Sequence, residues 1–195
     1  IDTFKEWFPI SFVQQLKFLN MCGNLGDPIV AKDTLEIFSY LRENNSEMTL
    51  QMHTNGSGRT EKWWKELAEL KVKIVFGIDG LEDTHALYRI NTHWNKVIKN
   101  AKTFINAGGD ARWDMLVFKH NEHQVDTCEQ MSSELGFKGF SIKHTTRFKD
   151  GKFDVLDDSY NITHTLLPSS KSLEMIAPAK QAQQEKLPLI TCKAK

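Results

Sequence analysis

The stretch that most constrains the fold is residues 16–28, Leu-Lys-Phe-Leu-Asn-Met-Cys-Gly-Asn-Leu-Gly-Asp-Pro. Its first half is a short, mostly apolar run suited to a buried strand, and Gly23 and Gly26 free the backbone where that strand must end. A helix pattern follows, which Asp33 or Thr34 can cap. A strand, a glycine turn with one acid and a helix form the unit in which an α/β protein places polar ligand groups.

The same unit recurs along the chain. Four further strands are predicted at residues 48–54, 72–78, 111–118 and 139–143. Helix patterns follow the second, third and fourth strands at residues 61–70, 94–107 and 122–135. Strands that alternate with helices form a parallel sheet with right-handed crossovers. Because polar residues gather after every strand, the pattern favours a partial barrel with five βα units over an open sheet with one switch point.

One domain with a C-terminal extension is expected. Residues 1–148 form the predicted barrel core, and residues 149–195 form the extension, in which the periodic pattern loosens. Asp150-Gly151 is a tight-turn signal between Phe148 and Phe153, and it predicts a small hairpin at the start of the extension.

Composition limits the partners and the compartment. The chain has 25 basic and 25 acidic residues, so no overall electrostatic field would recruit nucleic acid or an anionic membrane. No apolar run approaches the roughly 20 residues of a membrane helix, and the chain start lacks a signal-peptide pattern. A cytoplasmic protein is therefore expected. Trp63 and Trp64 are predicted to lie in the core, as are Cys22 and Cys128, which form no CxxC pair.

The turn at residues 23–28 has two interpretations. It is either a simple glycine turn after a strand or part of a ligand site. It matches neither the G-x-G-x-x-G fingerprint of dinucleotide sites nor a P-loop, which would need Gly-Lys-Ser/Thr. Exposed strand-end carbonyls together with the Asp27 carboxylate could instead accept hydrogen bonds from an ammonium group.

Histidines near the predicted strand ends leave a metal site open. One alternative function is a divalent-metal-dependent barrel hydrolase or lyase. Its candidate ligands are His53, Asp79, His120 and His144. The neighbouring Glu122 and His123 do not form the H-E-x-x-H pattern, and a helix cap at Asn121 explains that segment equally well.

A local basic cluster ends the core. Lys143, Arg147, Lys149 and Lys152 form either a solvated face or an anion site. If Lys143 points into the barrel, it could pair with a carboxylate of a ligand.

The successive strand ends resemble those of radical S-adenosylmethionine (radical SAM) enzymes. Leu25-Gly26-Asp27-Pro28 is similar to the G-E-P turn after their second strand, and Thr54-Asn55-Gly56 resembles the T-N-G that ends the third. Ile78-Asp79-Gly80 resembles the S-I-D-G of the fourth. Residues 81–109 are similar to the segment that follows in the SPASM-type subgroup, so the resemblance covers roughly residues 16–147.

The resemblance implies a partial (β/α)6 TIM-like barrel that binds SAM and a [4Fe-4S] cluster at its mouth. In that family the cluster reduces SAM, and the resulting 5′-deoxyadenosyl radical abstracts hydrogen from a substrate, with a flavodoxin or ferredoxin as electron donor. A peptide or small metabolite is the implied substrate. Position by position, the residues that would hold SAM are Asn24, Leu25, Gly26, Asp27, Thr54, Asn55 and Asp79, with Asn121 and Lys143 lining the same mouth.

Three departures from the family pattern stand out. Asp27 replaces the usual Glu, and Gly77 stands where many relatives have Ser. The CxxxCxxC motif that binds the cluster would lie upstream of Ile1. Cys192 resembles the first cysteine of the SPASM extension, so a fragment is expected that alone cannot hold the cluster. The other alternative is a non-catalytic binding domain that keeps the fold without a cluster.

Overall fold

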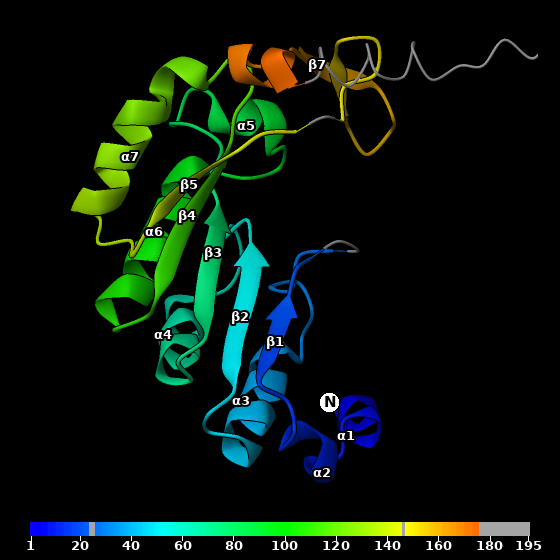
Figure 1. Ribbon diagram of the computed structural model, residues 1–195, viewed down its shortest axis with the longest axis vertical. Coiled ribbons are helices and arrows are strands. Elements are labelled where there is room, and N and C mark those ends of the chain that lie inside the picture. The colour runs from blue at the N-terminus through cyan, green and yellow to red at the C-terminus, as the bar shows by residue number, and fades with distance from the viewer. Residues whose placement is uncertain (24–25, 146, 176–195) are drawn as a thin grey trace, which may run out of the picture.

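A parallel five-stranded sheet forms the centre of the computed structural model, which describes residues 1–23, 26–145 and 147–175 (Figure 1). Its strands are β1 (Phe18–Met21), β2 (Thr49–Thr54), β3 (Lys73–Gly77), β4 (Ala111–Leu116) and β5 (Phe140–Lys143). Each strand pairs in parallel with the next one along the chain, so the strand order is β1-β2-β3-β4-β5. The predicted α/β class is confirmed, and the sheet is consistent with a partial TIM-like barrel.

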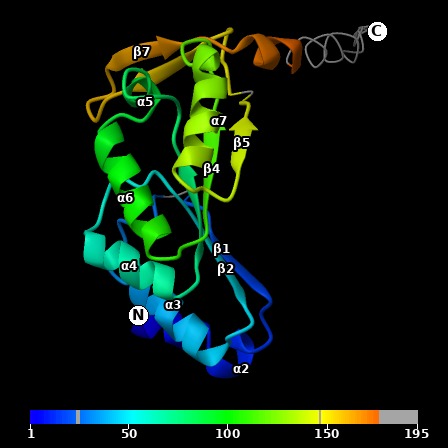
Figure 2. The ribbon, with the colours of Figure 1, turned by 90° about the vertical axis from the view of Figure 1, so that its left-hand side faces the viewer.

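Helices connect successive strands and cover one face of the sheet. The connecting helices are α3 (Thr34–Asn44), α4 (Glu61–Glu69), α6 (Trp94–Asn106), and α7 (Val125–Glu134) with the short 3₁₀ helix η1 (Glu122–Gln124) before it. Figure 2 shows α4, α6 and α7 in front of the strands. Alternate strand residues such as Leu50, Met52 and Trp113 point into this layer and are fully buried. The predicted core positions of Trp63 and Trp64 are confirmed.

The opposite face of the sheet carries the more polar side chains. Val75 lies in register with His53 on β2 and with Arg112 on β4, while Gly77 lies beside Asp114. These positions alternate with the buried ones, and none of their side chains except Val75 is buried. The polar side chains on this face are therefore available to line a site.

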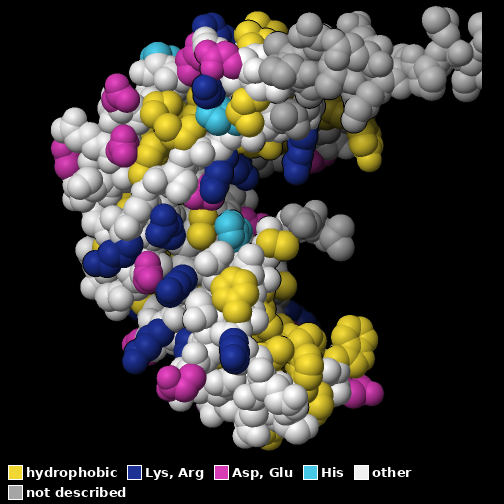
Figure 3. All heavy atoms as spheres, in the orientation of Figure 1, with side chains coloured by type: hydrophobic (Ala, Val, Ile, Leu, Met, Phe, Trp, Pro, Cys, Tyr) yellow, Lys and Arg dark blue, Asp and Glu magenta, His cyan; other side chains and the backbone are white. Residues whose placement is uncertain are grey.

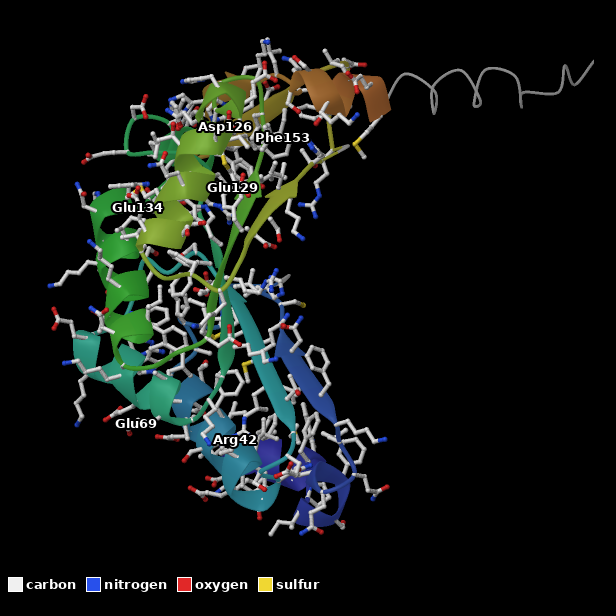
Figure 4. All side chains as sticks on the ribbon, turned by 60° about the vertical axis from the view of Figure 1, so that its left-hand side comes forward. Arg42, Glu69, Asp126, Glu129, Glu134 and Phe153 are labelled. Carbon is white, nitrogen blue, oxygen red and sulfur yellow. The ribbon has the colours of Figure 1, made fainter. Side chains whose placement is uncertain are left out.

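The amino ends of the strands are tied together by one arginine. Arg42, labelled in Figure 4, donates from Nε to the Leu70 carbonyl at 3.0 Å and from Nη1 to the Ser46 and Met48 carbonyls at 2.6 and 2.9 Å. These bonds join the end of α3 to the segments that lead into β2 and β3. The amino ends of the strands thus serve to stabilise the fold, as is usual for this end of a barrel.

A hairpin that follows the sheet packs against it through a second small core. Strands β6 (Phe153–Leu156) and β7 (Ile162–Leu166) form an antiparallel hairpin, and Val155 and Leu166 are buried against Phe118. The predicted Asp150-Gly151 turn forms, with Lys149 and Lys152 exchanging both backbone hydrogen bonds across it. Treating residues 1–148 and 149–195 as core and extension stays a prediction.

Some local predictions need correction. Three short helices were not predicted: α1 (Asp2–Trp7), α2 (Ile10–Val13) and α5 (His85–Tyr88). Strand β1 is an edge strand of the described sheet, with Phe18 53% exposed, so its apolar run is not buried as expected. No helix of the described residues is both long and apolar enough to cross a bilayer.

Candidate functional site

A pocket of about 440 Å³ opens at the carboxyl ends of the parallel strands. Figure 3 shows the molecule hollowed on the side away from the helices. Loops after β1, β2 and β3 and side chains of β2 to β5 meet in this pocket. Its lining residues are Cys22, Gly23, Asp27, His53, Thr54, Asn55, Val75, Gly77, Asp79, Arg89, Asp114, Leu116 and Lys143. These residues form the mouth pocket.

Asp27 is held by the backbone of two loops. Its Oδ2 accepts a hydrogen bond from the Asn55 N–H at 2.6 Å, and its Oδ1 accepts one from the Ile29 N–H at 3.1 Å. Each carboxylate oxygen can accept a second bond, and the half-buried side chain lines the pocket. Asp27 therefore has acceptor capacity left for a cationic group in the pocket.

Thr54 and Asn55 shape the loop after β2. The Thr54 hydroxyl accepts a hydrogen bond from the Gly56 N–H at 3.0 Å. The Asn55 Oδ1 accepts bonds from the Ser57 N–H at 2.9 Å and the Ser57 hydroxyl at 2.6 Å. These turns present the Asn55 backbone and amide beside Asp27 in the pocket lining.

Asp79 and Arg89 form an ion pair at the floor of the pocket. The Arg89 Nε lies 2.5 Å from the Asp79 Oδ2, and the Leu116 N–H donates to the Asp79 Oδ1 at 2.6 Å. Asp79 is fully buried, whereas the Arg89 side chain is 31% exposed. Burial raises the pKa of Asp79 above its ordinary value, and Arg89 and the Leu116 N–H oppose that shift. Arg89 was not among the site residues expected from the sequence.

The guanidinium of Arg89 lies close to the backbone of Gly77. A Cβ on Gly77 would lie 2.7 Å from the Arg89 Nη2, closer than such atoms approach in folded proteins. The guanidinium thus lies over the end of β3, at the position where many radical SAM enzymes carry Ser and this chain has Gly77. Its Nη1 and Nη2 make no hydrogen bond to the described residues, and Arg89 lines the pocket. These N–H groups are suited to a carboxylate or another anion.

One lysine and one cysteine also lie at the mouth pocket, and a second cysteine lies in the core. Lys143 lines the pocket, and its Nζ lies 3.5 Å from the Asp114 Oδ2. Cys22 was expected in the core, and it is instead exposed at the pocket edge, because it follows an edge strand. The core position predicted for Cys128 is confirmed, and burial raises the pKa of its thiol to about 12.

Asn121 lies outside the pocket lining. It is fully buried, its Nδ2 donates to the carbonyls of Asp79 and Leu116 at 3.1 Å each, and its Oδ1 accepts from the Phe118 N–H at 2.8 Å. The position of this amide corrects the prediction that Asn121 lines the mouth, because its hydrogen-bonding groups are used by the backbone. Gly26 is exposed beside the lining residues.

Part of the predicted site lies outside the described residues. Asn24 and Leu25 of the turn after β1 are not among them, and neither is Cys192. Their proposed contacts rest on the sequence alone.

The metal-site alternative is not favoured by the geometry. His53 bonds with Gln51 at 3.1 Å, and Asp79 is paired with Arg89. His120 stacks on Phe118. No three Asp, Glu, His or Cys side chains come together as metal ligands anywhere in residues 1–23, 26–145 and 147–175.

The basic cluster is divided between two places. Arg147, Lys149 and Lys152 line a separate surface pocket of about 330 Å³ that also contains Asp150 and Asp154. Lys143 alone reaches the mouth pocket.

Comparisons with known proteins identify the fold. No family model matches the chain, and no curated protein matches it in sequence. Among solved structures, SuiB of Streptococcus suis matches with 16% identity and a TM-score of 0.65 over 93% of this chain and 41% of SuiB. Native anSMEcpe with bound AdoMet and the Cp18Cys peptide matches with 18% identity and a TM-score of 0.61 over 83% of this chain and 47% of that chain.

A third solved structure is a radical SAM methyltransferase, TsrM of Kitasatospora setae, with cobalamin and a [4Fe-4S] cluster bound. It matches with 11% identity and a TM-score of 0.57 over 92% of this chain and 45% of TsrM. SuiB has also been solved with S-adenosylmethionine and with its precursor peptide SuiA. The chain spans less than half the length of each of these proteins and shares the fold of that part.

Proposed function

We propose that this chain is the central barrel portion of a radical SAM enzyme and that its mouth pocket binds SAM. The observation that carries the proposal is the presence of Asp27 and Arg89 in one pocket at the strand carboxyl ends. SAM carries an ammonium and a carboxylate on its methionine part, and these groups match a carboxylate and a guanidinium. Support also comes from the shared fold with SuiB and anSMEcpe, both solved with SAM bound.

The charged residues Asp27, Arg89 and Asp79 have distinct proposed roles in the mouth pocket. Asp27 accepts hydrogen bonds from the ammonium of SAM, together with the backbone of Asn24, Leu25 and Gly26. Arg89 donates from Nη1 and Nη2 to its carboxylate. Asp79, which is fully buried, holds Arg89 in place rather than contacting the nucleoside.

Three further residues of the pocket lining have proposed contacts with the ligand. Thr54 and Asn55 form the wall where the nucleoside would lie. Lys143, which can release Asp114, is a second candidate for an anionic ligand group.

The cysteines of the described chain do not fit a [4Fe-4S] site. Cys128 is buried on α7 and its thiol pKa is raised, whereas Cys22 alone reaches the pocket. Three thiolates are needed where SAM takes the remaining iron, so cluster ligands would have to come from outside the described residues. Membership of the SPASM subgroup and a ligand role of Cys192 are proposed only from the sequence.

A peptide is the substrate that we propose. Two of the structural neighbours have been solved with peptides, SuiB with SuiA and anSMEcpe with the Cp18Cys peptide. The mouth pocket is open, so a side chain of a larger molecule could enter it. A flavodoxin or ferredoxin as electron donor and a cytoplasmic location stay predictions from the sequence.

Isothermal titration calorimetry with SAM tests the proposal. The complete protein that contains residues 1–195 should bind SAM with one site per chain, and Arg89→Met should weaken that binding at least about tenfold by removing a charged hydrogen-bond donor. Arg42→Met, at the opposite end of the sheet, is the control for loss of an arginine. Equal affinity in the wild type and folded Arg89→Met would refute the proposed carboxylate site.

A further inference from the structure

Two loops of the mouth pocket are joined by a single side chain. Residues 27–31 follow β1 and carry Asp27, and residues 55–59 follow β2 and carry Asn55. Arg59, at the end of the second loop, reaches back to the first. Its Nε donates to the Ile29 carbonyl at 2.5 Å, and its Nη2 donates to the Ala31 carbonyl at 2.6 Å.

These contacts extend to the proposed ligand group through one residue. The Ile29 carbonyl accepts from Arg59, and the Ile29 N–H donates to the Asp27 Oδ1 at 3.1 Å. The Asp27 Oδ2 accepts from the Asn55 N–H at 2.6 Å. Asp27 is thus fixed between the two loops, and Arg59 closes the same connection from its outer side.

The conformation of Arg59 indicates that this contact is imposed by its surroundings. Its φ is +69°, in the left-handed region that a non-glycine residue adopts at a cost. Its guanidinium also lies over the Trp63 ring, with 5.4 Å from Cζ to the ring centroid. None of the salt bridges among the described residues involves Arg59, and its hydrogen bonds to described residues go to the backbone carbonyls of the first loop.

Side chains of two helices hold the backbone of the second loop in place. The buried Asn100 of α6 donates from Nδ2 to the carbonyls of Gly56 and Gly58 at 2.8 and 3.0 Å. The Trp64 indole N–H also donates to the Gly58 carbonyl, at 3.1 Å. Because the loop after β2 is tied to two helices, Arg59 transmits that position to the loop after β1.

We propose that Arg59 is a positioning residue: it fixes Asp27 against the loop after β2 and thereby sets the affinity of the mouth pocket for a cationic ligand group. The inference rests on the proposed function for the identity of the ligand. The positioning itself rests on the contacts of Arg59, Ile29 and Asp27. Arg59 does not line the mouth pocket and is not expected to touch the ligand.

Substitution by glycine separates positioning from stability. Arg59→Gly removes the guanidinium but also removes the cost of the left-handed backbone, so its stability loss is reduced. SAM binding should weaken about tenfold in calorimetry, as for the loss of charged hydrogen bonds. Hydrogen exchange of the Asn55 N–H should become at least about tenfold faster, because its bond to Asp27 loosens. Arg59→Lys, with one donor group instead of a fork, should recover only part of both effects.

Lys71→Gly is the matched control. Lys71 has a φ of +54° and lies just before β3, at the end of the sheet away from the pocket. It should change neither SAM affinity nor Asn55 exchange. If folded Arg59→Gly keeps wild-type exchange at Asn55, the inference is wrong. If wild-type protein does not bind SAM, the proposed function fails, while the exchange measurement still decides whether Arg59 positions Asp27.

Discussion

At the scale of single residues, the charge of Asp27 is the feature most open to test. Asp27→Asn keeps the size of the side chain but removes its charge and one of its acceptor oxygens. We expect SAM affinity to fall roughly thirtyfold, corresponding to about 2 kcal/mol for a charged hydrogen bond. Isothermal titration calorimetry with the complete protein measures the effect.

The control for this variant is Asp126→Asn on α7. Figure 4 labels Asp126 on this outer helix, and the residue is exposed. The control should bind SAM like the wild type. Wild-type affinity in Asp27→Asn would exclude Asp27 as the ammonium site.

His85 gives the molecule a pH dependence of stability. It is fully buried, its Nδ1 accepts from the Asp79 N–H at 3.1 Å, and burial lowers the pKa of its imidazole to about 4 from 6.5. Well above pH 6.5 the group is neutral in both the folded and the unfolded state. As the pH falls toward 4, the unfolded chain takes up the proton first, so folding becomes less favourable, by about 2 kcal/mol at pH 5.

Urea unfolding at pH 7.5 and pH 5 tests this contribution. The loss of unfolding free energy between the two pH values should be about 2 kcal/mol smaller in His85→Gln than in the wild type. Only the difference between the two pH values matters, because the substitution also changes the stability at each pH. Equal losses in both proteins would show that His85 titrates normally in the fold.

At the scale of elements, the turn after β3 depends on close packing. Gly80 has a φ of +111°, and a Cβ there would lie 2.2 Å from the Thr84 Oγ1 and 2.8 Å from the Gln124 Oε1. Gly80→Ala should therefore cost about 3 kcal/mol of unfolding free energy, from backbone strain and steric overlap together.

Gly108 after α6 provides the comparison for Gly80. It has a φ of +86°, but a Cβ there would meet no atom within 4 Å. Gly108→Ala should cost only about 1 kcal/mol, since strain is its only penalty. Equal costs for the two variants in urea unfolding would contradict the packing described around Gly80.

The strands and main helices could be predicted because each has a strong local pattern. The predicted strand at 48–54 and helix at 94–107 differ from β2 and α6 by one residue at one end. Arg89 could not be predicted as a pocket residue, because it reaches Asp79 only through α5, a helix of four residues without a clear periodic pattern. Gly77 was a signal that could have been used, since a glycine at a strand end often marks a close approach.

Two errors have the same physical origin. In the described sheet β1 pairs on one side only, and Cys22 and Phe18, which were expected to be buried, are exposed. Asn121 follows a strand like the other candidates, but its amide turns inward to backbone groups of two strand ends. Neighbouring strands decide both outcomes, and residue patterns along one strand do not include them.

At the scale of the whole molecule, the chain shares one part of the fold of larger proteins. It covers 36% to 47% of the lengths of the structural neighbours named above, and its described residues form the mouth pocket but bring no three metal-ligating side chains together. If the mouth pocket serves a radical SAM enzyme, as proposed, cluster ligands from outside the described residues complete it.

Anaerobic reconstitution of the complete protein tests whether it is a radical SAM enzyme. Iron and sulfide are quantified, and SAM cleavage is followed by chromatography of 5′-deoxyadenosine after reduction with dithionite. We expect about four iron atoms per cluster and formation of 5′-deoxyadenosine, both dependent on the cluster cysteines. A folded complete protein that binds no iron-sulfur cluster and does not cleave SAM would contradict the proposed function, and SAM binding alone would indicate a non-catalytic binding domain.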